Sequence, residues 1–188
     1  YAFFEPLFST GLAWSLVCVE RLADVLVCLG DERSRQLARY GALVEQEADH
    51  QQRLIEVTTR SRRSFETFRS TSFLYFAAAS FNELRQRLVP YRGAEQSWAW
   101  DGFLGAAHSG LRDLLLEAEK RLDGCAAAYG SWVQAAIKPY NLIGIGERSD
   151  HLYGVDLDCV VDRCDFLGLG REEMVALLPR LRGQASKG

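Results

Sequence analysis

The residues whose types and spacing best suit ligand chemistry stand at the beginning of the chain. A proline, two hydroxyl residues and a glycine precede an apolar run in the sequence Glu5-Pro6-Leu7-Phe8-Ser9-Thr10-Gly11. This order predicts a loop that opens a helix, whose first turn has unpaired N–H donors and the positive end of the helix dipole. An anion or an electron-rich ring edge is favoured there, and Gly11 would let it approach the backbone closely. An ordinary N-cap by Ser9 or Thr10 explains the same pattern.

The stretch from Glu5 to Trp14 resembles the last flavin-binding motif of the FAD-dependent halogenases, the tryptophan-halogenase-like flavoproteins, and of their monooxygenase relatives. A weaker likeness to the C-terminal helical region of bacterial members continues in Phe73 to Phe81, Pro139-Tyr140-Asn141, Val155-Asp156-Leu157 and Leu178-Pro179-Arg180-Leu181. The resemblance implies that FAD is contacted by Glu5, Pro6, Ser9, Thr10, Gly11 and Leu12. It also implies that Thr10 and Gly11 help to hold a chloride or bromide ion.

The resemblance implies that the chain is the C-terminal portion of a larger α/β flavoprotein. Residues 1–30 would form the end of the FAD-binding domain, with the flavin and halide loop and a buried helix, and residues 31–188 a C-terminal helical domain. The sequence has no Gly-x-Gly-x-x-Gly after a predicted strand, which is the motif that binds the ADP half of FAD. We therefore expect the Rossmann core of the FAD domain to lie upstream in the parent protein.

The same resemblance implies a redox reaction in which the flavin carries the chemistry. A flavin reductase would supply reduced FAD, and halide would attack the flavin hydroperoxide. The resulting hypohalous species would halogenate a small electron-rich aromatic substrate, which a carrier protein can hold. Phe8 stands where tryptophan halogenases carry a glutamate, so a phenol- or pyrrole-type substrate is expected rather than free tryptophan. The family's lysine would lie upstream, so no residue of this chain is assigned a catalytic role.

Two alternative functions stay open. A flavin-dependent monooxygenase or a reductase of the geranylgeranyl-reductase type would use the same first motif, without halide. A helical interaction module without catalytic activity would bind a partner and no flavin, and the absent dinucleotide fingerprint favours it.

Composition narrows the classes of partner and compartment. The net charge of −3 and the pI of about 5.7 argue against a nucleic-acid partner. The apolar run Leu12 to Leu29 contains three charged residues, which favours a buried helix over a membrane span. Five cysteines without a C-x-x-C pair indicate small core residues in a reducing compartment, so a cytoplasmic location is expected. Nothing in the spacing of histidines and cysteines predicts a metal site.

Hydrophobic periodicity predicts a mainly α fold. The six expected helices are Ser9 to Leu29, Glu32 to about Arg63, Phe65 to about Pro90, Asp101 to Leu122, Ala126 to Ile137 and Glu172 to Leu181. The first is apolar on nearly all sides, so it is expected to be packed on most of its surface. Val155 to Val161 fits either a short helix or a strand.

Three further groups of side chains are interpreted as structural. The arginines of residues 53–69 could meet an acidic carrier or a phosphate, but a solvated face paired with Glu45, Glu47, Glu56 and Glu66 is preferred. The aromatic residues between Phe65 and Phe81 could line a substrate pocket, although a core role is the commoner one. His108 is interpreted as a hydrogen-bonded core histidine rather than a base.

Overall fold

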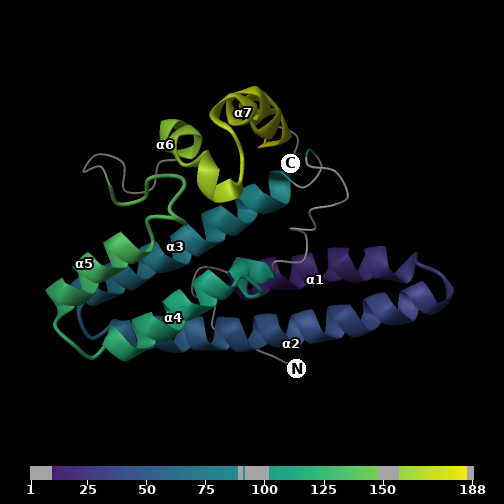
Figure 1. Cartoon of the computed structure of the whole chain (residues 1–188). Coiled ribbons are helices and arrows are strands. Elements are labelled where there is room, and N and C mark those ends of the chain that lie inside the picture. The colour runs from purple at the N-terminus through teal and green to yellow at the C-terminus, as the bar shows by residue number, and fades with distance from the viewer. Residues whose placement is uncertain (1–9, 89–90, 92–101, 148–156, 186–188) are drawn as a thin grey trace.

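The fold was analysed in a computed structural model that describes residues 10–88, 91, 102–147 and 157–185 (Figure 1). The helices are α1 (Thr10–Leu26), α2 (Gly30–Ser61), α3 (Phe65–Leu88), α4 (Ser109–Arg121), α5 (Ala126–Ala136), α6 (Leu157–Asp162) and α7 (Arg171–Ala185). Two short 3₁₀ turns accompany them, η4 (Phe103–Gly105) and η5 (Cys164–Leu167). No strand occurs in these ranges, so the mainly α prediction is confirmed.

The long helix α2 supports two shorter helices along its length. Figure 1 shows α1 lying along the N-terminal half of α2 and α4 along its C-terminal half. The helix α3 packs on α2 and carries α5 and η4, while α6 and α7 lie near the C-terminal end of α3 (Figure 1). The bundle therefore has α2 and α3 at its centre, with α1 attached mainly through α2.

Most of the predicted helices lie within a few residues of the observed ones. The open choice over Val155 to Val161 is resolved for the described residues, because Leu157–Asp162 is the helix α6. The helix predicted from Asp101 to Leu122 starts too early: His108 is the N-cap of α4. Just before it, Leu104 and Gly105 have φ values of 54° and 74°. A right-handed helix cannot continue through residues in the left-handed region, which explains the later start.

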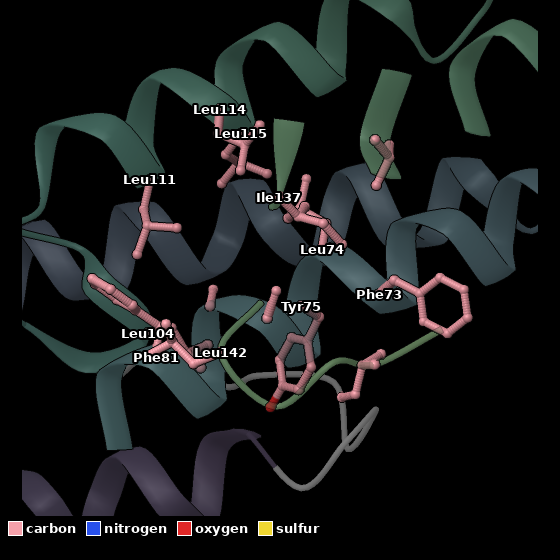
Figure 2. Packing of buried hydrophobic residues seen from close by; sticks show 14 of the residues in the cluster. Phe73, Leu74, Tyr75, Phe81, Leu104, Leu111, Leu114, Leu115, Ile137 and Leu142 are labelled. Carbon is pink, nitrogen blue, oxygen red and sulfur yellow. The ribbon is translucent and has the colours of Figure 1, made fainter. Parts of the chain in front are cut away.

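The aromatic stretch of α3 forms the centre of the core, as predicted. Phe81 is only 2% exposed, and Phe73 and Tyr75 are also buried. Figure 2 shows side chains from other elements around them, Leu111 and Leu115 of α4 among them. The start of α3 lies outside this core, because Phe65 in its first turn is 80% exposed and Phe68 is only half-buried.

The prediction that α1 is packed on most of its surface is wrong. Its inner face, which meets α2 and the core, carries Trp14, Val17, Arg21 and the buried Val25. Its opposite face, here called the outer face of α1, consists of Leu12, Leu16, Val19, Ala23 and Leu26, all of them exposed. Leu12, Leu16 and Val19 are 67%, 63% and 66% exposed. The helix is apolar on two sides, but the described chain covers only one of them.

Candidate functional site

The residues predicted to contact flavin and halide fall into two groups. Glu5, Pro6 and Ser9, together with Phe8, lie outside the described residues. Thr10, Gly11 and Leu12 form the first turn of α1. The structure thus places the end of the motif at a helix start, as expected from its sequence.

The Thr10 side chain points into the interior of the protein. It is only 2% exposed, and its hydroxyl is hydrogen-bonded to the Tyr75 hydroxyl of α3 at 3.0 Å. Burial raises the pKa of Tyr75, and the hydrogen bond between the two hydroxyls opposes that rise. A ligand at this helix start would therefore meet the backbone of Thr10 and Gly11 rather than the threonine hydroxyl. Gly11 is half-exposed and Leu12 largely exposed, so this side of the turn is open.

A buried carboxylate fixes α1 on the bundle. Glu47 of α2 is fully buried and forms an ion pair with Arg21 of α1. The Trp14 indole N–H donates to Glu47 Oε2 at 2.7 Å, and the Phe103 backbone N–H donates to Oε1 at 2.5 Å. One carboxylate thus joins α1, α2 and η4. Hydrogen bonds to a charged acceptor are the stronger kind, so this group holds the helix that carries the end of the motif.

Sequence reasoning missed the role of Glu47, which was placed on a solvated face. The spacing of its neighbours could have revealed this role. Leu43 stands four residues before Glu47, and His50 and Leu54 stand three and seven residues after it, so they share one side of the helix with Glu47. All three are buried. A glutamate within such an apolar row is buried, and a buried carboxylate requires a cationic partner.

Arg53 and Arg60 of α2 and Arg63 just after it find their partners at the C-terminal end of α4 and in the turn that follows it, rather than in the glutamates that were expected. Arg53 Nη1 lies 2.6 Å from a Glu119 carboxylate oxygen. Arg60 Nη2 lies 2.7 Å from the Asp123 carboxylate, which Arg63 also contacts. These side chains are substantially exposed, in agreement with a solvated face, and such pairs contribute little to stability.

His108 has a structural role, as predicted. Its Nδ1 accepts a hydrogen bond from the Leu111 backbone N–H at 3.4 Å, so the imidazole caps α4. Its ring makes edge contacts with Phe81 and Tyr140 at centroid distances of 5.5 and 5.6 Å. This geometry orients the ring for capping and packing.

The cysteines differ from the expected core residues. Only Cys164 is buried, whereas Cys125 is exposed and the other three are half-buried.

Among the described residues no three His, Cys, Asp or Glu side chains come together as metal ligands. Within the same part of the chain, no helix has both the length and the apolar character needed to cross a bilayer.

The open first turn of α1 and the outer face of the same helix are continuous. Leu12 belongs to both, and Leu16, Val19, Ala23 and Leu26 extend the apolar row along the helix. These side chains can pack but carry no group for acid–base or nucleophilic chemistry. What the arrangement offers is a helix start with an accessible backbone beside an apolar packing surface.

Comparison with known proteins leaves the family of this chain open: no family model matches the chain, and no curated protein or solved structure gives a significant match.

Proposed function

We propose that this chain is the C-terminal helical part of an FAD-dependent oxidoreductase of the halogenase type. The substrate class that fits Phe8 in the motif is an electron-rich aromatic of the phenol or pyrrole kind rather than free tryptophan. Chloride or bromide would be the halide, and a flavin reductase would supply reduced FAD. The proposal is supported by the motif that leads into α1 and by the exposed outer face of that helix.

The outer face of α1 carries the proposal. A helix that is apolar on two opposite sides is normally buried on both of them. Here one side is covered by α2, while Leu12, Leu16 and Val19 remain more than half exposed. Contiguous exposed apolar side chains mark interaction surfaces. An FAD domain whose last segment runs into Thr10 is the neighbour that chain continuity favours for this face.

The residues present fit a flavin ring at the start of α1. The half-exposed Gly11 has no Cβ to hold a planar ring away from the backbone, and the Thr10 hydroxyl is already engaged by Tyr75. The donors would be the backbone N–H groups of the first turn, aided by the helix dipole. FAD, when bound, would supply the redox chemistry. The part of this chain would be to orient the ring edge and the halide and to keep the helix start in place through Glu47.

A flavin-binding comparison tests the proposal. The 188-residue chain and the same chain extended upstream to a complete dinucleotide fold would be titrated with FAD and followed by fluorescence. The extended protein should retain FAD and the shorter chain should not. Binding by neither protein would leave only a capped helix start, and the helical interaction module would then replace the enzyme proposal.

Two glycine variants of the extended protein give a matched control. Gly11→Ala adds a methyl group where the ring would lie and should weaken FAD binding. Gly41→Ala adds the same group to α2, where nothing lies within 4 Å of the new Cβ, and should leave it unchanged. Equal FAD affinities of the two variants would argue against a flavin at the start of α1.

Halide dependence separates the enzyme alternatives. With reduced FAD, oxygen and a phenolic substrate, a halogenase yields a chlorinated or brominated product only when that halide is present. A monooxygenase yields a hydroxylated product with or without it, and mass spectrometry of the product distinguishes the two reactions.

A further inference from the structure

A second site of different chemistry lies between α2 and α4. It is an open pocket of about 200 Å³. Its lining residues come from one face of each helix and are Gln46, Asp49, His50 and Arg53 of α2 and Arg112, Leu115 and Leu116 of α4. None of them belongs to the motif at the start of α1, so inferences about this pocket do not depend on the proposed flavin site.

Arg112 is the group in the lining that can receive an anion: Arg53 is neutralised by Glu119 outside the lining, and the charges of Arg112 and Asp49 balance. Arg53 is paired with Glu119, but the Arg112 side chain has no hydrogen-bond or ion-pair partner among the described residues. Asp49 is the one carboxylate in the lining, and it is exposed. An arginine fork matches a carboxylate geometrically and can donate two parallel hydrogen bonds to it.

A neutral imidazole forms part of the wall. His50 is 8% exposed, and burial lowers its pKa to about 4, with the Arg112 and Arg53 charges acting in the same direction. A hydrogen bond to the Leu104 backbone partly opposes this shift. The ring therefore presents an aromatic, uncharged surface to the pocket near pH 7, next to the side chains of Leu115 and Leu116.

We propose that this pocket binds a small organic monocarboxylate, with its carboxylate on Arg112 and its apolar body on Leu115, Leu116 and the His50 ring. A volume of about 200 Å³ equals that of roughly seven water molecules at about 30 Å³ each. It lies below the roughly 300 Å³ at which pockets for drug-sized ligands begin. One ring with one acid group fits this space. Inorganic phosphate would leave the leucines without a partner, and Asp49 would repel a polyanion more strongly than a monocarboxylate.

Benzoate is the probe that tests this assignment in the 188-residue chain. A proton NMR titration would follow the His50 imidazole, identified by comparison with the His50→Gln variant. Saturable binding with a Kd of about 1–10 mM is expected for a ligand of this size, with a shift of the His50 resonance. Benzyl alcohol, which keeps the ring but lacks the charge, should bind at least about tenfold more weakly.

Two single-charge variants on α4 provide the matched comparison. Arg112→Ala should weaken benzoate binding about tenfold or more, because it removes the charged fork. Lys120→Ala removes the same charge from an exposed site that pairs with Glu117 and should change binding less than about twofold. Circular dichroism of both variants verifies that the helices are intact, and Arg112→Lys tests the fork with the charge retained.

Four results would overturn the proposal. They are equal binding of benzoate and benzyl alcohol, equal binding by the Arg112→Ala and Lys120→Ala variants, a His50 resonance that does not respond to benzoate, and inorganic phosphate binding as tightly as benzoate. The first two would remove the role of Arg112. The third would place the ligand elsewhere, and the last would reduce the site to a general anion site.

Discussion

The helices α1 and α3 are both rich in apolar residues, but α3 is held by burial of its apolar side chains and α1 largely by a buried ion pair. The α3 side chains Phe73, Tyr75 and Phe81 are buried within the bundle. The outer face of α1 stays exposed, and its inner face is tied to α2 by a buried ion pair between Arg21 and Glu47. Apolar composition therefore indicates that a helix needs neighbours, but it does not say whether this chain supplies them. Under the proposed function, the FAD domain would cover the outer face of α1.

Truncating the centre of α3 should have the largest effect. Phe81→Ala removes a ring that is 2% exposed and contacts His108 and Tyr140 by its edges, so we expect the free energy of unfolding to fall by about 4 kcal/mol. Urea denaturation measures it. Phe65→Ala, on the same helix but 80% exposed, is the control and should change it by less than about 0.5 kcal/mol. Similar losses for the two variants would contradict the assignment of the core.

Breaking the ion pair between Arg21 of α1 and Glu47 of α2 should have the second-largest effect on stability. Glu47→Ala leaves Arg21 buried without its partner and removes the acceptor of Trp14 and Phe103, so a loss of about 3 kcal/mol is expected. Trp14 fluorescence reports the detachment of α1, although the other tryptophans contribute to the signal. Glu45→Ala, an exposed neighbour on α2, is the control. If both variants unfold at the same urea concentration, Glu47 does not hold α1.

The helix α2 also carries a buried histidine, which makes stability depend on pH. Burial and neighbouring arginines lower the pKa of His50 from 6.5 to about 4, so the folded state keeps this ring neutral while the unfolded chain binds a proton below pH 6.5. Stability should therefore fall as the pH drops from 6.5 toward 4. Between pH 7 and pH 4.5 the contribution of this group is about 2–3 kcal/mol.

The histidine contribution can be isolated with a variant. Urea denaturation of the wild-type chain and of His50→Gln at both pH values should show a smaller loss on acidification in the variant. The two arginines whose charges lower the pKa of His50, Arg53 of α2 and Arg112 of α4, and the neighbouring Asp49 are present in both proteins. An unchanged loss in the variant would assign the pH dependence to other groups.

Removing the hydrogen bond between Thr10 of α1 and Tyr75 of α3 should have a smaller effect. Tyr75→Phe removes the hydroxyl that contacts Thr10 at 3.0 Å and keeps the ring in the core. We expect a loss of about 1 kcal/mol in the free energy of unfolding. Tyr140→Phe, at a half-buried tyrosine whose hydroxyl makes no hydrogen bond to the described residues, serves as the comparison. A loss of several kcal/mol for Tyr75→Phe would mean that the ring itself had moved.

The smallest effect is expected on the outer face of α1. Leu16→Gln replaces a side chain that is 63% exposed and should change the stability of the 188-residue chain by less than about 0.5 kcal/mol. In the chain extended upstream the same substitution should cost more, because this face would be buried against the FAD domain. Equal effects in both proteins would show that no upstream domain covers α1.

Much of the secondary structure could be predicted from the sequence alone. Apolar residues at helical spacing predicted the ranges of most helices, and the aromatic stretch of α3 was correctly assigned to the core. These features depend on local propensity and on the tendency of large apolar side chains to leave water. The likeness of the first motif to flavin halogenases belongs to the sequence as well, and it remains a prediction.

Only the tertiary structure decided which faces and charges are buried. It placed Glu47 under α1 beside Arg21, turned the Thr10 hydroxyl toward Tyr75 and left the outer face of α1 exposed. It also brought Arg112 to the pocket that contains His50, from positions distant in sequence. Helical periodicity identifies the sides of one helix, whereas burial depends on which other helix packs there. That choice is made by contacts between distant segments, which a single sequence does not display.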